Sequence, residues 1–279
     1  MINSPYPKNM TNQEDETLIL DVIEQFLERD VKPYVRELEA EDIYPEEISN
    51  KLAELGLYGA TISPEYGGLG LTAATYSKIV ERCSEVWMAV SGIFNSHLIM
   101  ASAVERFGSN KMKKEYLPKF ASGEMRGGIA LTEPDCGTDL QGIRTVATRD
   151  GDDYVINGSK MWITNSLKGN VLAVLAKTDL EASPPHKGMS LFLAEKSTGY
   201  QGSKLNKLGY KAIDTASLHF EDVRVPVANA VGEINRGWYV GATHLDFERS
   251  SIGSAVGFQH RLDDMINFMK SESKKENGR

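Results

Sequence analysis

Apolar side chains recur at helical spacing through about the first 124 residues of the chain. Residues three or four positions apart share one face of a helix. The first predicted helix therefore has an apolar stripe made of Leu18, Val22, Phe26 and Leu27. Pro33 is expected to interrupt or kink this helix, because a proline ring removes a backbone donor and clashes with the preceding turn.

Two further helical patterns follow in the same region. Residues 44–59 predict a short helix with Pro45 near its start and Gly56 at the C-cap position. Its inward positions are Ile48, Leu52 and Leu55. Residues 72–107 predict a long, very apolar pair of helices that Gly108 ends.

The pattern changes near Gly123 to short alternating runs separated by turns. Leu218 and Phe220, for example, alternate with polar neighbours, as in a sheet with one face buried. An Asp-Gly-Asp turn joins the first two predicted strands. The strand-forming segments are residues 144–158, 170–178, 189–196 and 215–225. We expect residues 125–236 to form a small antiparallel β domain after an N-terminal helical domain of residues 1–124.

A helical pattern returns in residues 237–279. One or two helices after a β domain would have little to pack against. We therefore expect the start of a C-terminal helical bundle, in a chain that is truncated or completed by another polypeptide. The predicted fold class is α+β.

Composition narrows the class of protein. The 279 residues are 41% hydrophobic and 25% charged, as in an ordinary soluble globular protein. A net charge of −8 argues against general nucleic-acid binding. The chain has no run of the roughly 20 apolar residues that span a bilayer, and no signal-peptide pattern. Cys83 and Cys136 have neither disulfide-framework nor metal-ligand spacing. These features predict a cytoplasmic protein with no membrane partner and no metal.

Two segments carry the candidate chemistry: Ala130–Leu140, ALTEPDCGTDL, and Asn157–Ser166, NGSKMWITNS. Both combine backbone-bending residues with hydroxyl groups, and the second adds an indole. That mixture suits a flat ligand with polar edges better than a plain core. Taken singly, Thr132 and Thr138 are better explained as turn or capping residues, and Trp162 as a core aromatic.

The order of these segments resembles that of the acyl-CoA dehydrogenase family of flavoproteins, over nearly the whole chain. Four other stretches are similar to the family: residues 54–71 (ELGLYGATISPEYGGLGL), 106–124 (RFGSNKMKKEYLPKFASGE), 204–226 (KLNKLGYKAIDTASLHFEDVRVP) and 232–238 (GEINRGW). Several linked motifs in the same order are a strong signal, whereas any one alone would be weak.

The resemblance implies FAD, with its isoalloxazine between the β domain and the C-terminal helices. The implied cofactor contacts are Ile129, Ala130, Leu131, Thr132, Thr138, Trp162, Ile163 and Thr164. In this arrangement the Thr132 hydroxyl lies near the polar edge of the ring, Trp162 lies beside the ring and Thr164 lies near its N5. Thr138 stands where the family usually has Ser, in contact with cofactor phosphate or with the thioester ligand. Hydrogen-bond donors near N1 and C2=O would stabilise a reduced flavin, which carries negative charge there.

The implied reaction is FAD-dependent α,β-dehydrogenation of an acyl-CoA thioester to a trans-2-enoyl-CoA. Its base is a Glu whose pKa a dry pocket raises. Most family members carry this Glu on a late helix that has no counterpart here. A minority, acting on branched or long acyl groups, carry it early and before an Arg. Glu248, followed by Arg249, matches that early position, and Asp246 and Arg249 match positions that hold the acyl-CoA. Glu248 and Arg249 could equally be a helix-dipole charge and a salt-bridge partner.

The resemblance also bears on partners and alternatives. It implies an electron-transfer flavoprotein as acceptor and a homo-oligomer, either a dimer or a tetramer. Lys274 replaces an Arg of a later FAD-contacting segment, so it keeps the charge but loses the planar fork. One alternative is a flavin oxidase or monooxygenase of the same fold, and another is a fragment or partner-binding subunit without turnover. His97 and His244 lack the partners of a nucleophile pair, so we interpret them as packing or polar-network residues.

Overall fold

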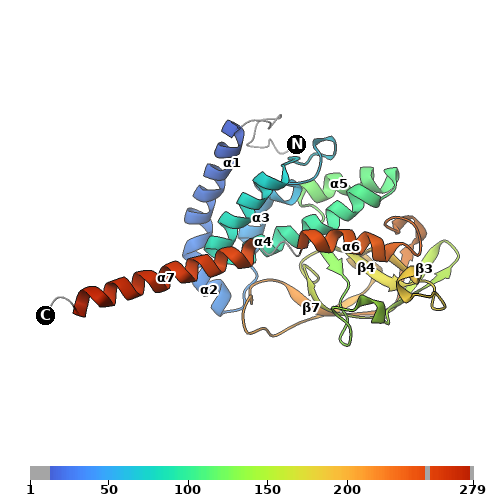
Figure 1. Cartoon of the computed structure of the whole chain (residues 1–279). Helices are drawn as coiled ribbons and strands as arrows, with labels where there is room; N and C mark the ends of the chain where they lie inside the picture. Colours follow the sequence, from blue (N-terminus) through green and yellow to red (C-terminus); the bar gives the residue numbers. More distant parts are fainter. Residues whose placement is uncertain (1–12, 249–251, 277–279) are drawn as a thin grey trace.

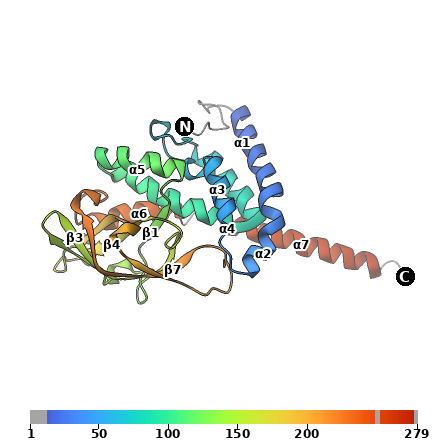
Figure 2. The same ribbon diagram turned by 180° about the vertical axis from the view of Figure 1, so that it is seen from behind.

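A layer of helices lies over a β-sheet, and one long helix projects away from both (Figures 1 and 2). The structure, a computed structural model, describes residues 13–248 and 252–276. The helical layer comes from the N-terminal part of the chain. Its α-helices are α1 Gln13–Phe26, α2 Val35–Ala40, α3 Glu46–Glu54, α4 Ala73–Phe107 and α5 Asn110–Ser122. Short turns of helix connect them: η1 Leu27–Val31, η2 Lys32–Tyr34, η3 Leu57–Gly59 and η4 Pro64–Tyr66.

The buried stripe of α1 differs from the predicted one by one position. Ile19 and Ile23 are buried and continue into the predicted Phe26 and Leu27, whereas Leu18 is 46% exposed. Val22 is half-buried at the edge of the stripe. The prediction was wrong for Leu18, because residues 19, 23, 26 and 27 follow the i, i+4, i+7, i+8 spacing of one face.

Alanine substitutions should separate these two neighbouring positions. Ile19→Ala should lower the free energy of unfolding by about 3 kcal/mol, since it removes a fully buried side chain and leaves a cavity. Leu18→Ala should change it by less than about 0.5 kcal/mol, because much of that side chain is already in water. Urea unfolding followed by circular dichroism measures both. Equal effects would show that Leu18 is as buried as Ile19, contrary to the observed face of α1.

Pro33 and Gly56 act as predicted. The regular α1 helix gives way to a π turn and then to the 3-10 turn η2, which contains Pro33. Gly56 follows α3 in the left-handed conformation, with φ of 70°. Ile48 and Leu52 of α3 are buried, and Leu55 is half-buried.

The long α4 contains the predicted break between two helices. Trp87 has non-helical angles, φ −163° and ψ 109°, so α4 is kinked there. The Trp87 Nε1–H donates to Glu39 Oε2 at 3.3 Å. By length and composition α4 could cross a membrane, but 67% of its most apolar window is buried inside the protein, as in a core helix.

The sheet is mixed, which corrects the predicted wholly antiparallel domain. Within the described residues its strands are β1 Gly127–Ala130, β2 Val146–Asp150, β3 Asp153–Thr164, β4 Val171–Lys177, β5 Met189–Glu195, β6 Gln201–Lys204 and β7 Thr215–Pro226. The order is β1-β4-β2-β3-β7-β6, and β5 pairs with β4. β1 and β4 run parallel, and so do β2 and β4 at a single pair. Parallel pairing is possible because the β2–β3 hairpin supplies a long connection between β1 and β4.

β4 is buried on both faces. Val171, Ala173 and Leu175 face the core shared with the helices, whereas Leu172 and Val174 face a second core within the β domain. This explains its continuous apolar sequence. β1 lies at the same junction, since it contacts α4 as well as β4. The junction between the helical layer and the sheet is therefore closely packed.

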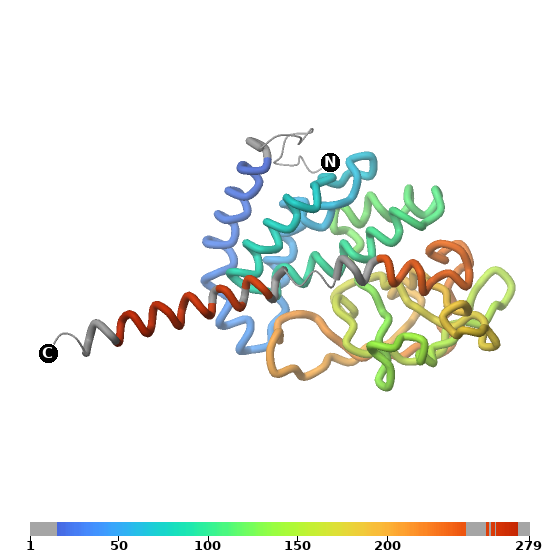
Figure 3. The backbone as a smooth tube through the Cα atoms, viewed as in Figure 1, coloured from blue at the N-terminus to red at the C-terminus, as the bar shows by residue number. Residues whose placement is uncertain are grey.

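Two helices follow the sheet. α6 (Gly237–Glu248) lies along α4 and β5, and α7 (Ile252–Glu276) begins beside α4. α7 then continues past the helical layer, and its C-terminal half projects from the body of the protein (Figure 3). Its exposed large apolar residues are Phe258, Leu262, Met265, Ile266, Phe268 and Met269.

Candidate functional site

The two motif segments meet at the junction of β1 and β3. The Met161 N–H donates to Thr132 O at 2.9 Å. A Cβ atom on Gly128 would lie only 2.6 Å from Thr164 O, so the two backbones approach as closely as glycine allows. The structure thus brings together the loop that carries Thr132 and the strand end that carries Trp162 and Thr164.

Trp162 is a surface residue, unlike a core aromatic. It lies where the register of β3 with β7 shifts between Lys160 and Ile163. Its φ is +64° and its side chain is 54% exposed. Such a conformation costs about 1–3 kcal/mol for a residue other than glycine, and β-bulges of this kind often re-aim a side chain at a functional site. The bulge therefore holds the indole at the protein surface, where it is accessible to a ligand.

The other predicted cofactor contacts fall into two groups. Thr132 and Thr164 are half-buried, and within the described residues neither hydroxyl has a hydrogen-bond partner. Thr138 is exposed on the loop, and Ile129 is half-buried against the helical core. The side chains of Ala130, Leu131 and Ile163 are buried in the core, so they can offer a ligand only their backbone.

An ion pair that the sequence motifs did not reveal lies beneath this loop. Lys160 and Glu133 are both buried, and Lys160 Nζ donates to Glu133 Oε1 and to Leu131 O, both at 2.9 Å. The Glu133 carboxylate also accepts from Arg144 N at 2.6 Å, Thr145 N at 3.0 Å and Thr145 Oγ1 at 2.6 Å. A sequence signal existed, because Lys160 follows Tyr154 and Ile156 at the two-residue spacing of a buried strand face.

The two groups of this pair are both charged near neutral pH. Burial lowers the pKa of Lys160 to about 8, against the opposing attraction of Glu133. Burial alone would raise the pKa of Glu133, but the Lys160 charge and the hydrogen bonds from Thr145 and Arg144 outweigh it, so that pKa lies below its ordinary value.

Asn165 and Asp214 hold the turn that follows Thr164. Asn165 has a φ of 58°, and its Nδ2 donates to Ile93 O at 2.8 Å and to Gly127 O at 2.9 Å. Asp214 Oδ2 accepts from Leu167 N at 2.7 Å and from Lys168 N at 2.6 Å. Burial raises the pKa of Asp214 in spite of these backbone hydrogen bonds. The turn is therefore fixed to α4, to β1 and to the residue that precedes β7.

His97 joins the helical layer to β1, as a polar-network histidine should. The Gly127 N–H donates to Nδ1 at 3.3 Å, which leaves Nε2–H to donate to Phe120 O at 3.2 Å. The ring also makes edge contacts with Tyr58 and Phe120. Burial, with a smaller contribution from the Arg126 charge, lowers the pKa of His97 from 6.5 to about 4.

This histidine should make the protein less stable in acid. The unfolded chain binds a proton at His97 below pH 6.5, whereas the folded protein does so only near pH 4. The stability that neutral His97 contributes is therefore present above pH 6.5 and is lost as the pH falls toward 4, by up to about 3 kcal/mol. Urea unfolding across this range should show a steeper loss for the wild type than for His97→Gln. Parallel pH profiles would contradict the assignment.

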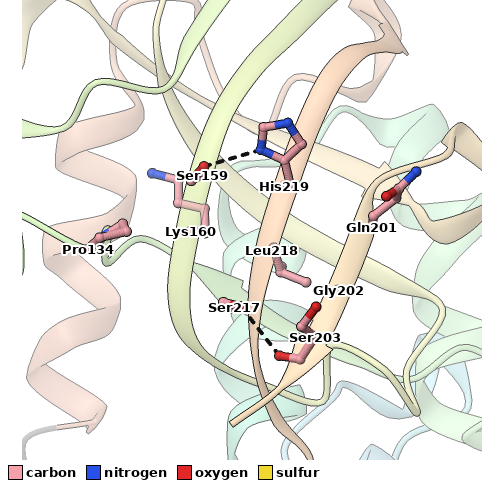
Figure 4. A pocket seen from close by; sticks show the side chains of 9 residues that line it. All are labelled: Pro134, Ser159, Lys160, Gln201, Gly202, Ser203, Ser217, Leu218 and His219. Atoms are coloured by element: carbon pink, nitrogen blue, oxygen red, sulfur yellow. Dashed lines mark hydrogen bonds between the residues drawn. The ribbon is translucent and has the colours of Figure 1, made fainter.

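A polar pocket of about 310 Å³ adjoins the loop at Pro134 (Figure 4). β3, β6 and β7 line it, with Ser159, Gln201 and His219 in one row across the three strands. Ser159 Oγ and His219 Nδ1 are 3.3 Å apart, and Lys160 forms part of the wall.

In the described part of the chain, no group of three or more His, Cys, Asp or Glu could hold a metal ion.

The predicted catalytic residues lie at the end of α6. Glu248 is its last residue and Asp246 lies in its last turn, but their side chains are outside the described residues, as is that of His244. Arg249 also lies outside the described residues, and so does the Lys274 side chain in α7. Their roles stay predictions.

Comparisons with known proteins agree with this architecture. Residues 13–124 match the acyl-CoA dehydrogenase N-terminal domain, and residues 128–223 match the acyl-CoA dehydrogenase middle domain. The chain is 35% identical to a mitochondrial isovaleryl-CoA dehydrogenase of Pongo abelii, over 92% of this chain and 62% of that protein. It is 36% identical to a mitochondrial long-chain specific acyl-CoA dehydrogenase of Sus scrofa, over 96% of this chain and 65% of that protein. It thus spans a little less than two thirds of these relatives.

A solved structure gives the same result. The acyl-CoA dehydrogenase of Geobacillus kaustophilus superposes with a TM-score of 0.85 and 33% identity, covering 90% of this chain and 67% of that chain.

Proposed function

Because the chain belongs to the acyl-CoA dehydrogenase family, we propose that it binds FAD and an acyl-CoA thioester for α,β-dehydrogenation to a trans-2-enoyl-CoA. One observation carries the proposal: the exposed indole of Trp162 and the unpaired hydroxyls of Thr132 and Thr164 belong to two segments that meet at the junction of β1 and β3. An aromatic face beside unpartnered polar groups suits a flat ring with polar edges.

The residues present fit a flavin. Trp162 offers a face for ring contact, and the Thr132 and Thr164 hydroxyls are free to donate to the polar edge of the ring. Donors at that edge favour the reduced ring, which carries negative charge there. Thr138, exposed on the same loop, is available for a phosphate or for the thioester ligand. When bound, FAD supplies the hydride acceptor of the reaction.

Glu248 is the proposed base. Its carboxylate removes the α proton of the thioester, and the electron pair of that C–H bond forms the new double bond as the β hydrogen leaves as hydride. Asp246 and Arg249 are proposed to orient the acyl-CoA. The early position of Glu248 favours a branched or long acyl group. An electron-transfer flavoprotein is the proposed acceptor, and a homo-oligomer the proposed assembly.

A visible absorption spectrum tests this function. The purified protein is supplied with FAD under anaerobic conditions, and branched, long and short acyl-CoAs are added in turn. We expect retained flavin whose oxidised band bleaches, most completely with the preferred acyl group. A folded sample that retains no flavin would overturn the proposal and favour a partner-binding role. Retained flavin that does not bleach would refute the assignment of Glu248 as base.

A further inference from the structure

We propose that the buried Lys160–Glu133 pair is a positioning device that holds the loop after β1 in the shape that binds FAD. The inference rests on the proposed function. Both side chains are buried, so they act through the groups that they hold, which are Leu131 O, Arg144 N and Thr145.

The Lys160 ammonium group connects the two motif segments, because it belongs to the second and bonds to the first. Lys160 extends from β3 to Leu131 O and to the Glu133 carboxylate. The bulge that exposes Trp162 begins immediately after Lys160, and Met161 donates to Thr132 O. Thr132 and Trp162 are therefore both fixed by contacts of residues 160 and 161.

Stability alone does not account for a buried charge pair at this place. Removing two charges from water is costly, and apolar residues of similar volume often serve a protein core at least as well. The sequence could also have continued the apolar face of Tyr154 and Ile156. What an apolar residue could not do is bond the Leu131 carbonyl and orient a carboxylate that accepts from Arg144 and Thr145. The pair therefore specifies a loop conformation.

Three variants separate positioning from mere stability. Lys160→Met keeps an unbranched side chain that is one atom shorter and removes the charge, leaving Glu133 buried without a counter-ion. Lys160→Met combined with Glu133→Gln removes both charges and keeps one oxygen, which can accept from Thr145 in place of Glu133 Oε1. Lys168→Met is the matched control, because Lys168 is exposed and pairs with Glu46 on the surface.

FAD affinity, flavin midpoint potential and thermal midpoint are measured for each variant. Lys160→Met should weaken FAD binding at least tenfold and shift the potential. The double variant should recover part of the thermal midpoint, because no unpaired charge stays buried, but not the affinity, whereas Lys168→Met should match the wild type. Wild-type affinity and potential in the folded double variant would overturn the proposal.

Cys136 gives a readout that needs no flavin. It lies in the loop and is half-buried, with its thiol donating to Asp139 O at 2.7 Å, whereas Cys83 is buried. Loss of the Lys160–Glu133 pair should speed Cys136 alkylation in Lys160→Met at least tenfold. The sign is informative: burial raises the pKa of this thiol and the Lys160 charge opposes that rise, so removal of the charge alone would slow the reaction. If the wild type retains no flavin, the proposed function fails. An unchanged alkylation rate in Lys160→Met would then also overturn the positioning role of the Lys160–Glu133 pair.

Discussion

Alanine in place of Gly127 should lower the free energy of unfolding by more than about 4 kcal/mol, or prevent folding altogether. A Cβ atom there would lie 1.9 Å from Val171 O and 3.0 Å from Met100 Sδ. The first contact is with the backbone of the neighbouring parallel strand, which cannot move aside without breaking the β1–β4 ladder. Urea unfolding, or the yield of soluble protein, measures the effect.

The loss would extend beyond one strand pair. The Gly127 N–H donates to His97, and Gly127 O accepts from Asn165. A displaced β1 would therefore detach the helical layer and the turn after Thr164 together. Gly209→Ala is the matched control, because a Cβ atom there meets nothing within 4 Å, and it should change stability by less than about 0.5 kcal/mol. A Gly127→Ala protein with wild-type stability would show that β1 and β4 are not packed as described.

Local patterns predicted the helices and their ends well. The turn at Pro33, the left-handed Gly56 and the break within α4 depend on residues close in sequence, which is why the sequence located the first two and anticipated the third. The apolar face of α1 was missed by one residue, because Leu18 and Ile19 are both apolar and only the tertiary contacts choose between them.

Long-range pairing was beyond local reasoning. The parallel alignment of β1 with β4 joins segments about 40 residues apart, and no turn signal marks it. The outward direction of Trp162 depends on a register shift between β3 and β7, which needs both strands in place. The partnership of Lys160 with Glu133 likewise appears only when the loop folds back over β3. The motifs thus located the candidate site, whereas its supporting contacts came from the fold.

Replacing Glu248 with Gln should leave FAD binding unchanged and slow flavin reduction by acyl-CoA about 10²- to 10⁴-fold. Gln has nearly the shape of Glu but cannot accept the α proton, and a positioned general base contributes a factor of this size. Because the change is nearly isosteric and lies at the end of α6, the fold and the flavin spectrum should stay as in the wild type. Anaerobic rapid mixing of FAD-loaded protein with the acyl-CoA that bleaches the wild type gives the rate directly.

Glu221→Gln provides the matched control, since Glu221 is an exposed carboxylate on β7 and its removal changes the net charge equally. It should reduce at the wild-type rate. If Glu248→Gln also reduces at that rate, another group removes the proton, and Glu248 with Arg249 would then be a helix-end charge and its salt-bridge partner. A slow variant with normal flavin affinity would place the base in an early position on the first helix after the β domain.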